Sequence, residues 1–152
     1  MKKFYFLLPG LILFICCHKN NNNTNWHYYE VGTKTTDSNW RDTSFIVATS
    51  NPQLIQEVNA ELQKSIDQRR IVLGNLRPGS GGYNHNDRYW FRWHFQENTW
   101  QLTDVSAELY DGKPYTDVDR HLRYWIDTVG RFSPWNSYIK KELNPSYDET
   151  IH

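Results

Sequence analysis

Residues 45–53 combine a short strand with the beginning of a helix, and they read Phe45-Ile46-Val47-Ala48-Thr49-Ser50-Asn51-Pro52-Gln53. The first five residues are apolar or β-branched and predict a buried strand. Asn51 and Pro52 predict a helix start, because Asn can accept from a free N–H of the first turn and the fixed φ of proline suits the first helical position. Apolar residues then recur on one helical face: Leu54, Ile55, Val58, Leu62 and Ile66. The structured domain is therefore predicted to begin at Phe45.

Strands are predicted to dominate the next part of the chain. A second strand is expected at Ile71–Leu73, followed by a long loop over Gly74–Arg88 that holds four of the eight glycines. A loop of this length usually carries a function or is disordered. Replacement of Gly79–Asn84 by a short turn is expected to leave stability nearly intact, because loop length changes the entropy of loop closure only slowly. The strand expected over Tyr89–Phe95 places its aromatic side chains on one face. A hairpin-length connection then leads to a returning strand over Trp100–Tyr110, with a bulge near Thr103-Asp104.

Helices are predicted toward the C-terminus. Thr116 is the expected cap of the second helix of the chain, and Gly130 is expected just past the end of that helix. Ser133-Pro134 is expected to begin a third, short helix. Trp125 and Trp135 fall on the inward faces of these two helices and are both expected to be buried. The order of elements predicts an α+β fold, in which a small, mainly antiparallel sheet has two or three helices packed on one face.

The N-terminal segment has the pattern of a secretion signal. Met1-Lys2-Lys3 is basic, and an apolar run from Phe4 ends at Cys16-Cys17. The run is short for a membrane span and resembles a bacterial lipobox, which predicts a lipoprotein signal over residues 1–17 with Cys17 as the lipidated residue. A plain signal peptide, a retained anchor and modification at Cys16 are the alternatives. The chain is then expected in the cell envelope, extracytoplasmic and held to a membrane only through its lipid.

The remaining chain divides by composition. Residues 18–44 form a polar, asparagine-rich tether and a lead-in that could add an edge strand. The α+β domain is expected over residues 45–145, with a tail over 146–152.

Composition excludes several classes of protein. The full chain has 17 basic and 17 acidic side chains, and a nucleic-acid-binding protein usually has a basic excess. A mean hydropathy of −0.79 excludes a protein with many membrane spans. Both cysteines lie in the signal, so the mature domain has no disulfide, zinc–thiolate site or cysteine nucleophile.

Several blocks between Phe45 and Leu143 together resemble a known family. They are Ala48-Thr49-Ser50-Asn51-Pro52, Arg70-Ile71-Val72-Leu73-Gly74, Gly81-Gly82-Tyr83-Asn84, Trp93-His94-Phe95, Glu108-Leu109-Tyr110-Asp111-Gly112-Lys113-Pro114 and the block from Tyr124 to Trp135. The chain resembles the N-terminal domain of the seventy-four-kilodalton calmodulin-binding protein, a domain that recurs in secreted bacterial proteins. In that family Cys often occupies the positions of Tyr110 and Ser133, so the resemblance implies a bridge that this chain lacks. Calmodulin binding is not transferred, because a bacterial lipoprotein would meet no calmodulin.

The glycine-rich loop and its aromatic flank are the expected working surface. Tyr83, Arg88 and Trp90 are the candidate ligand-binding residues, because exposed rings beside arginine suit a protein, peptide or glycan ligand. The first hypothesis is thus a non-catalytic recognition domain. The alternative is a small envelope hydrolase that uses His94 with Asp104 or Glu108. A third reading is a protease-inhibitor-like module.

Metal and phosphate sites are not expected. His85-Asn86-Asp87 and Asp119-Arg120-His121 contain ligand types but no zinc-binding spacing. The glycine loop leads into a strand rather than a helix, which excludes a phosphate cradle. No cofactor is therefore predicted.

Overall fold

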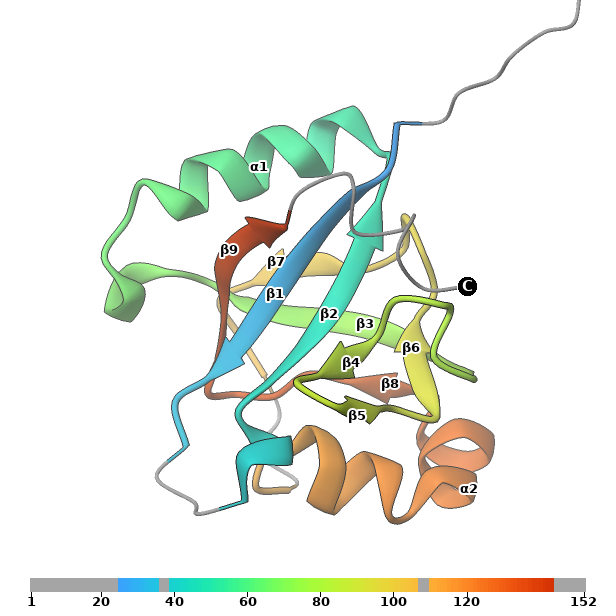
Figure 1. Ribbon diagram of the computed structural model, residues 1–152. Coiled ribbons are helices and arrows are strands. Elements are labelled where there is room, and N and C mark those ends of the chain that lie inside the picture. The colour runs from blue at the N-terminus through green and yellow to red at the C-terminus, as the bar shows by residue number, and fades with distance from the viewer. Residues whose placement is uncertain (1–24, 36–38, 107–109, 144–152) are drawn as a thin grey trace, which may run out of the picture.

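Figure 1 shows a computed structural model of the protein, which describes residues 25–35, 39–106 and 110–143. Antiparallel sheets and short helical segments form the predicted α+β fold. Helix α1 (Pro52–Leu62) lies above the sheets in Figure 1, and the helical segment that contains α2 (Leu122–Tyr124) lies below them. Within the described ranges, no helix is long and apolar enough to cross a membrane.

The first sheet has β1 (His27–Thr33) at its centre, between β2 (Ser44–Thr49) and β9 (Ser137–Leu143). Both pairings are antiparallel. The lead-in was expected to add an edge strand, but its strand β1 is the central one. Tyr29 packs into the main core and Tyr28 packs against Tyr83 in a second cluster, so β1 is buried on both faces and lacks the alternation that marks a half-exposed strand.

Strand β9 replaces the predicted third helix. Residues 137–143 pair with β1, and Ile139 is completely buried in the main core. Trp135 precedes the strand and is 46% exposed, so its predicted burial is also wrong. The spacing of apolar residues after Pro134 fits a helix, but the pairing with a distant strand decides the structure.

The second sheet is built on β3 (Ile71–Pro78). This strand pairs antiparallel with β7 (Gln101–Thr103) near its start, β8 (Arg131–Phe132) at its middle and β6 (Trp93–Phe95) near its end. The sequence predicted a hairpin between the strand that ends at Phe95 and the strand that begins at Trp100. This prediction is wrong, because β6 and β7 both pair with β3 and not with each other. The predicted loop begins later than expected, since residues 74–78 belong to β3. A separate small hairpin joins β4 (His85–Asn86) and β5 (Tyr89–Trp90).

The first helix begins as predicted. The Asn51 side chain accepts from the backbone N–H of Gln53 at 3.0 Å, and Pro52 is the first helical residue. The helix ends at Leu62, and Ile66 lies in the separate turn η2 (Ile66–Gln68), where its side chain is exposed.

The predicted second helix consists of three short segments. They are the π-helical η3 (Pro114–Asp119), α2 and the π-helical η4 (Trp125–Val129). Because η3 begins at Pro114, Thr116 is not its cap. The carboxylate of Asp42, in the turn η1 (Trp40–Asp42), accepts from the first N–H groups instead. Gly130 ends η4 with φ of +71°, as predicted.

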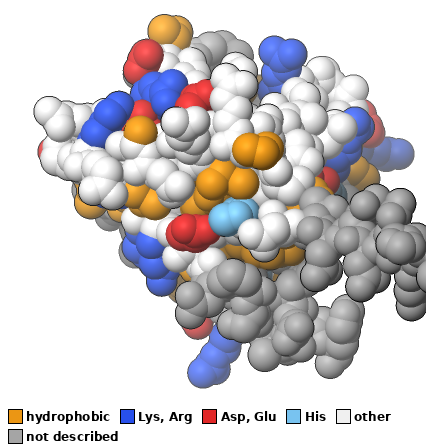
Figure 2. Space-filling view, turned by 90° about the horizontal axis from the view of Figure 1, so that it is seen from above, with side chains coloured by type: hydrophobic (Ala, Val, Ile, Leu, Met, Phe, Trp, Pro, Cys, Tyr) orange, Lys and Arg blue, Asp and Glu red, His pale blue; other side chains and the backbone are white. Residues whose placement is uncertain are grey.

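Charges on the end of the molecule that carries α1 are mixed. Figure 2 shows this end from above, with basic, acidic and hydrophobic side chains interspersed among polar ones. No patch of a single charge dominates the part of this face that described residues form.

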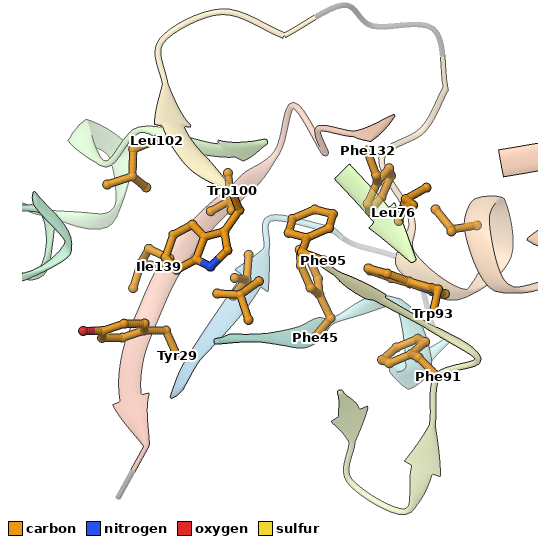
Figure 3. Packing of buried hydrophobic residues seen from close by; sticks show 14 of the residues in the cluster. Tyr29, Phe45, Leu76, Phe91, Trp93, Phe95, Trp100, Leu102, Phe132 and Ile139 are labelled. Carbon is orange, nitrogen blue, oxygen red and sulfur yellow. The ribbon is translucent and has the colours of Figure 1, made fainter. Parts of the chain in front are cut away.

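The main core is aromatic and lies between the two sheets (Figure 3). The single strand predicted over residues 89–95 is divided into β5 and β6. Phe91, Trp93 and Phe95 are nevertheless at most 1% exposed, so these aromatic side chains point inward together, as predicted. The rings of Phe45 and Phe132 pack against that of Trp93 with centroids 5.3 and 5.7 Å away. Gly74 lies in β3 because a Cβ there would overlap the ring of Phe95.

Candidate functional site

The glycine-rich segment that the sequence singled out is held tightly by the core. Tyr83 is buried, and its hydroxyl donates to the carbonyl of Phe95 at 3.0 Å. Burial and the neighbouring Glu97 carboxylate raise the pKa of Tyr83 well above its usual value, so the hydroxyl remains a donor. The Tyr83 ring contacts Tyr28 and His94 rather than solvent. A ligand could not stack on it without local opening.

Asn84 fixes the next position of the same segment. Its side chain accepts from the N–H of Ile46 at 2.9 Å and donates to the carbonyl of Trp93 at 2.8 Å. The residue is completely buried and joins the edge of β2 to β6. Tyr83 and Asn84 therefore connect the two sheets, which is a structural role.

Arg88 and Trp90 lie on the hairpin of β4 and β5, and both are exposed. The Trp90 ring packs on the ring of His85, with centroids 4.7 Å apart. Of the three predicted ligand-binding residues, Arg88 and Trp90 therefore lie on the surface, whereas Tyr83 is buried.

The structure describes two of the three alternative catalytic residues, His94 and Asp104. His94 Nδ1 is 2.7 Å from the carbonyl oxygen of Gly79, and its Nε2 is 3.5 Å from a carboxylate oxygen of Glu97. Asp104 is exposed beyond the end of β7, and Glu108 lies outside the described residues. His94 thus supports the glycine segment through contacts that the sequence did not predict.

A groove of about 700 Å³ opens between the end of β3 and the broken helical segment. Its lining contains basic, apolar and aromatic side chains and one carboxylate, and it consists of Pro78, Arg92, Arg120, His121, Leu122, Arg123, Tyr124, Ile126 and Asp127. We call this surface the arginine groove. Most of these residues belong to the helical segment that contains α2, which lies beneath the sheets in the view of Figure 1.

The chain geometry explains the position of this groove. The π-helical turn η3 ends at Asp119, and His121 has the non-helical angles φ −118° and ψ 35° before α2 begins. The direction of the helix is thus interrupted at Arg120 and His121, which brings both side chains to the surface. Irregular π-helical turns of this kind are frequent at functional sites.

Arg92 forms the wall of the groove on the side of the sheet. The completely buried carboxylate of Asp119 accepts from Arg92 Nε at 3.1 Å and from its backbone N–H at 2.7 Å. Tyr89 donates its hydroxyl to the same carboxylate at 2.6 Å, and burial together with this bond raises the pKa of Tyr89 to about 12. These contacts neutralise Arg92 and hold it in place.

The helical wall carries two further arginines with little compensation. Arg123 is 96% exposed and lies 3.9 Å from Asp127, an exposed pair of small electrostatic value. Arg120 is exposed, and no acidic side chain of the described chain lies within ion-pair distance of it. The groove therefore has excess positive charge that a ligand could match.

A metal site has no support in this geometry. Across residues 25–35, 39–106 and 110–143, no group of three or more His, Asp or Glu side chains is arranged to hold an ion.

A family model for the BP-74 N-terminal domain matches residues 27–146. The chain belongs to this family. The BP-74 N-terminal domain here spans every described strand and helix, from the start of β1 to the end of β9, and includes both walls of the arginine groove. This family, that of the seventy-four-kilodalton protein, is the one that the sequence resembled. No curated protein and no solved structure matches the chain.

Two positions of this BP-74 N-terminal domain where the resemblance implied cysteines are brought together. Tyr110 and Ser133 line one pocket of about 220 Å³, beside Trp125 and Phe132. In this chain both side chains line the pocket, and the hydroxyl groups of Tyr110 and Tyr124 form a hydrogen bond of 2.8 Å.

The sequence did not predict the arginine groove. Of its arginines, Arg120 stands out in the sequence only within the triplet Asp119-Arg120-His121, which contains metal-ligand types without zinc-binding spacing. Arg120 and Arg123 are three residues apart in the sequence, but the helix is interrupted between them, so helical spacing alone would not have predicted the groove.

Proposed function

We propose that this BP-74 N-terminal domain is a non-catalytic recognition module, lipid-anchored through Cys17 on the extracytoplasmic side of a bacterial membrane, and that it binds its ligand in the arginine groove. The observation that carries the binding proposal is the exposed pair Arg120 and Arg123 above a partly apolar groove. Concave sites that combine apolar surface with a few polar groups are typical of ligand binding.

Recognition is preferred over hydrolysis because of the contacts of His94. A general base must reach the proton that it removes, whereas both ring nitrogens of His94 face groups of its own glycine segment and strand connection. We therefore assign His94 a supporting role in the fold.

The anchor is tested by Cys17→Ser in the full chain. We expect the variant to lose labelling by a fatty-acid analogue and to move from the membrane fraction to the soluble fraction. Cys16→Ser is the matched control and should change neither result. Persistent labelling of the Cys17→Ser protein would rule out Cys17 as the anchor.

The recognition surface is tested by capture from envelope extracts. We compare the unaltered chain with an Arg120→Glu/Arg123→Glu double variant and with Arg88→Glu and Trp90→Ala on the β4–β5 hairpin. Loss of capture in the double variant alone would support the groove. Loss in the hairpin variants alone would place the site at Arg88 and Trp90, and equal capture by all four proteins would overturn recognition through either surface.

A further inference from the structure

We infer that the arginine groove binds an extended peptide segment that carries both acidic and apolar side chains. This inference rests on the proposed recognition function and adds the chemical class of the ligand. It starts from the charges that face the groove. Arg92 is neutralised by Asp119, and Asp127 lies only at the edge of ion-pair distance from Arg123, so Arg120 and Arg123 supply the uncompensated charge.

The chemistry of the cations favours carboxylates. All the permanently charged basic side chains that line the groove are arginines. A guanidinium group offers paired N–H donors in a plane, which match the two oxygens of a carboxylate. Arg120 and Arg123 lie on either side of the point where α2 begins, so two neighbouring acidic groups of one ligand could be bound together.

The apolar part of the lining argues for a peptide rather than a free anion. Leu122 and Ile126 are half-buried and pack against the main core, while Pro78 faces them from the end of β3. A small inorganic anion would leave these side chains unused. An aliphatic side chain of a peptide would cover them and remove apolar surface from water.

A membrane surface or a nucleic acid fits the groove less well. The site is concave, and the chain has as many acidic as basic side chains. Nucleic-acid-binding surfaces usually show a broad basic stripe. An acidic glycan would use the arginines, but the aliphatic lining offers it little beyond Tyr124.

The test uses the full chain in a neutral detergent and fluorescence anisotropy with short labelled peptides. The probe alternates glutamate and leucine. In one control peptide glutamine replaces every glutamate, and in the other serine replaces every leucine. We expect each control peptide to bind about tenfold or more weakly than the probe, because one removes charge-assisted hydrogen bonds and the other removes apolar contact.

Protein variants locate the site. Arg120→Glu/Arg123→Glu should weaken binding of the probe at least about tenfold, whereas Arg88→Glu, the same charge change on the hairpin, should not. Thermal unfolding of each variant shows whether the fold is intact. Arg120→Gln and Arg123→Gln single variants provide milder changes if the double variant unfolds.

Three results would overturn the peptide class. They are equal binding of the glutamine peptide, unchanged binding by the double variant, or stronger competition by oligogalacturonate or by vesicles of anionic phospholipid than by unlabelled probe. If the labelled glutamate–leucine peptide does not bind, but the double variant captures less from envelope extracts than the unaltered chain, the recognition function stands and only the ligand class is wrong. If both fail, the groove is not the recognition site.

Discussion

The carboxylate of Asp42 accepts hydrogen bonds from both the backbone N–H and the hydroxyl of Thr116, a residue far along the chain. The same carboxylate accepts from the N–H of Tyr115 at 2.8 Å. Asp42 is completely buried. Through these hydrogen bonds it caps the irregular helix and links η1 to the segment that leads into the arginine groove. A long-range cap of this kind positions the groove relative to the first sheet.

Asp42→Ala should lower the free energy of unfolding by roughly 2–3 kcal/mol, because it leaves buried N–H groups without an acceptor. Urea denaturation measures the change. Asp42→Asn keeps one carbonyl acceptor and should lose less stability than the alanine variant. Equal stability of Asp42→Ala and the unaltered chain would contradict the capping role.

Trp125 and Trp135 offer a matched pair of substitutions. Trp125 is 5% exposed and its ring packs 5.4 Å from that of Phe132, whereas Trp135 is largely exposed before β9. Trp125→Ala should cost about 3–5 kcal/mol by emptying a core site. Trp135→Ala should cost less than about 1 kcal/mol.

Thermal and urea unfolding of the two variants distinguish this arrangement from the one that the sequence predicted, in which both costs are large. A large loss with Trp135→Ala would mean that this ring is buried.

Local signals predicted the parts of the fold that depend on neighbouring residues. Asn51 and Pro52 start α1 through contacts within one turn, and Gly130 ends η4 because it adopts a positive φ. The shared burial of Phe91, Trp93 and Phe95 follows from their alternation along the sequence. These features need no knowledge of distant segments.

Distant pairing decided the parts that were predicted wrongly. The residues of β9 have the apolar spacing of a helix but form a strand because they pair with β1. β1 was not predicted as a central strand, because both its faces are buried and its sequence lacks the alternation of a half-exposed strand. The arginine groove has the same origin. Arg92 lies between β5 and β6, Arg120 follows η3, and Arg123 lies in α2. The groove therefore combines side chains from separate segments of the chain, and the buried Asp119 fixes one of them, Arg92.

Asn84 should be essential for stability although it lies in a glycine-rich segment. Asn84→Ala removes an acceptor from the N–H of Ile46 and a donor from the carbonyl of Trp93, both inside the protein. We expect a loss of roughly 2 kcal/mol or more in the free energy of unfolding. Asn86→Ala is the control, since its amide bonds to Trp40 and Thr43 at the surface and should contribute less than about 1 kcal/mol.

Replacement of residues 79–84 by a short turn should likewise destabilise the domain, because it also removes Tyr83. The sequence predicted nearly unchanged stability for that replacement, so a melting temperature close to that of the unaltered chain would favour a free loop.

The buried carboxylate of Glu61 should make stability depend on pH. Its side chain accepts from the side chain of Arg70 at 2.8 Å, from the Arg70 backbone N–H at 2.9 Å and from Lys64 at 2.8 Å. Burial alone would raise its pKa, but the hydrogen bonds from Lys64 and Arg70 prevail and lower the pKa below the ordinary value of 4.5. A carboxyl group whose pKa is lower in the folded state contributes its full stabilisation above the pKa of the unfolded state.

That contribution is lost as the pH falls through the folded-state pKa. Glu61→Gln should therefore cost on the order of 2 kcal/mol at pH 7, and the difference from the unaltered chain should shrink steadily below about pH 4. Glu57→Gln is the control on the same helix, because Glu57 contacts the same Arg70 at 3.3 Å from a partly exposed position and should contribute less than about 1 kcal/mol. Urea titrations at a series of pH values measure both differences. A Glu61→Gln difference that stays constant down to acid pH would show that the ionised carboxylate is not the stabilising form.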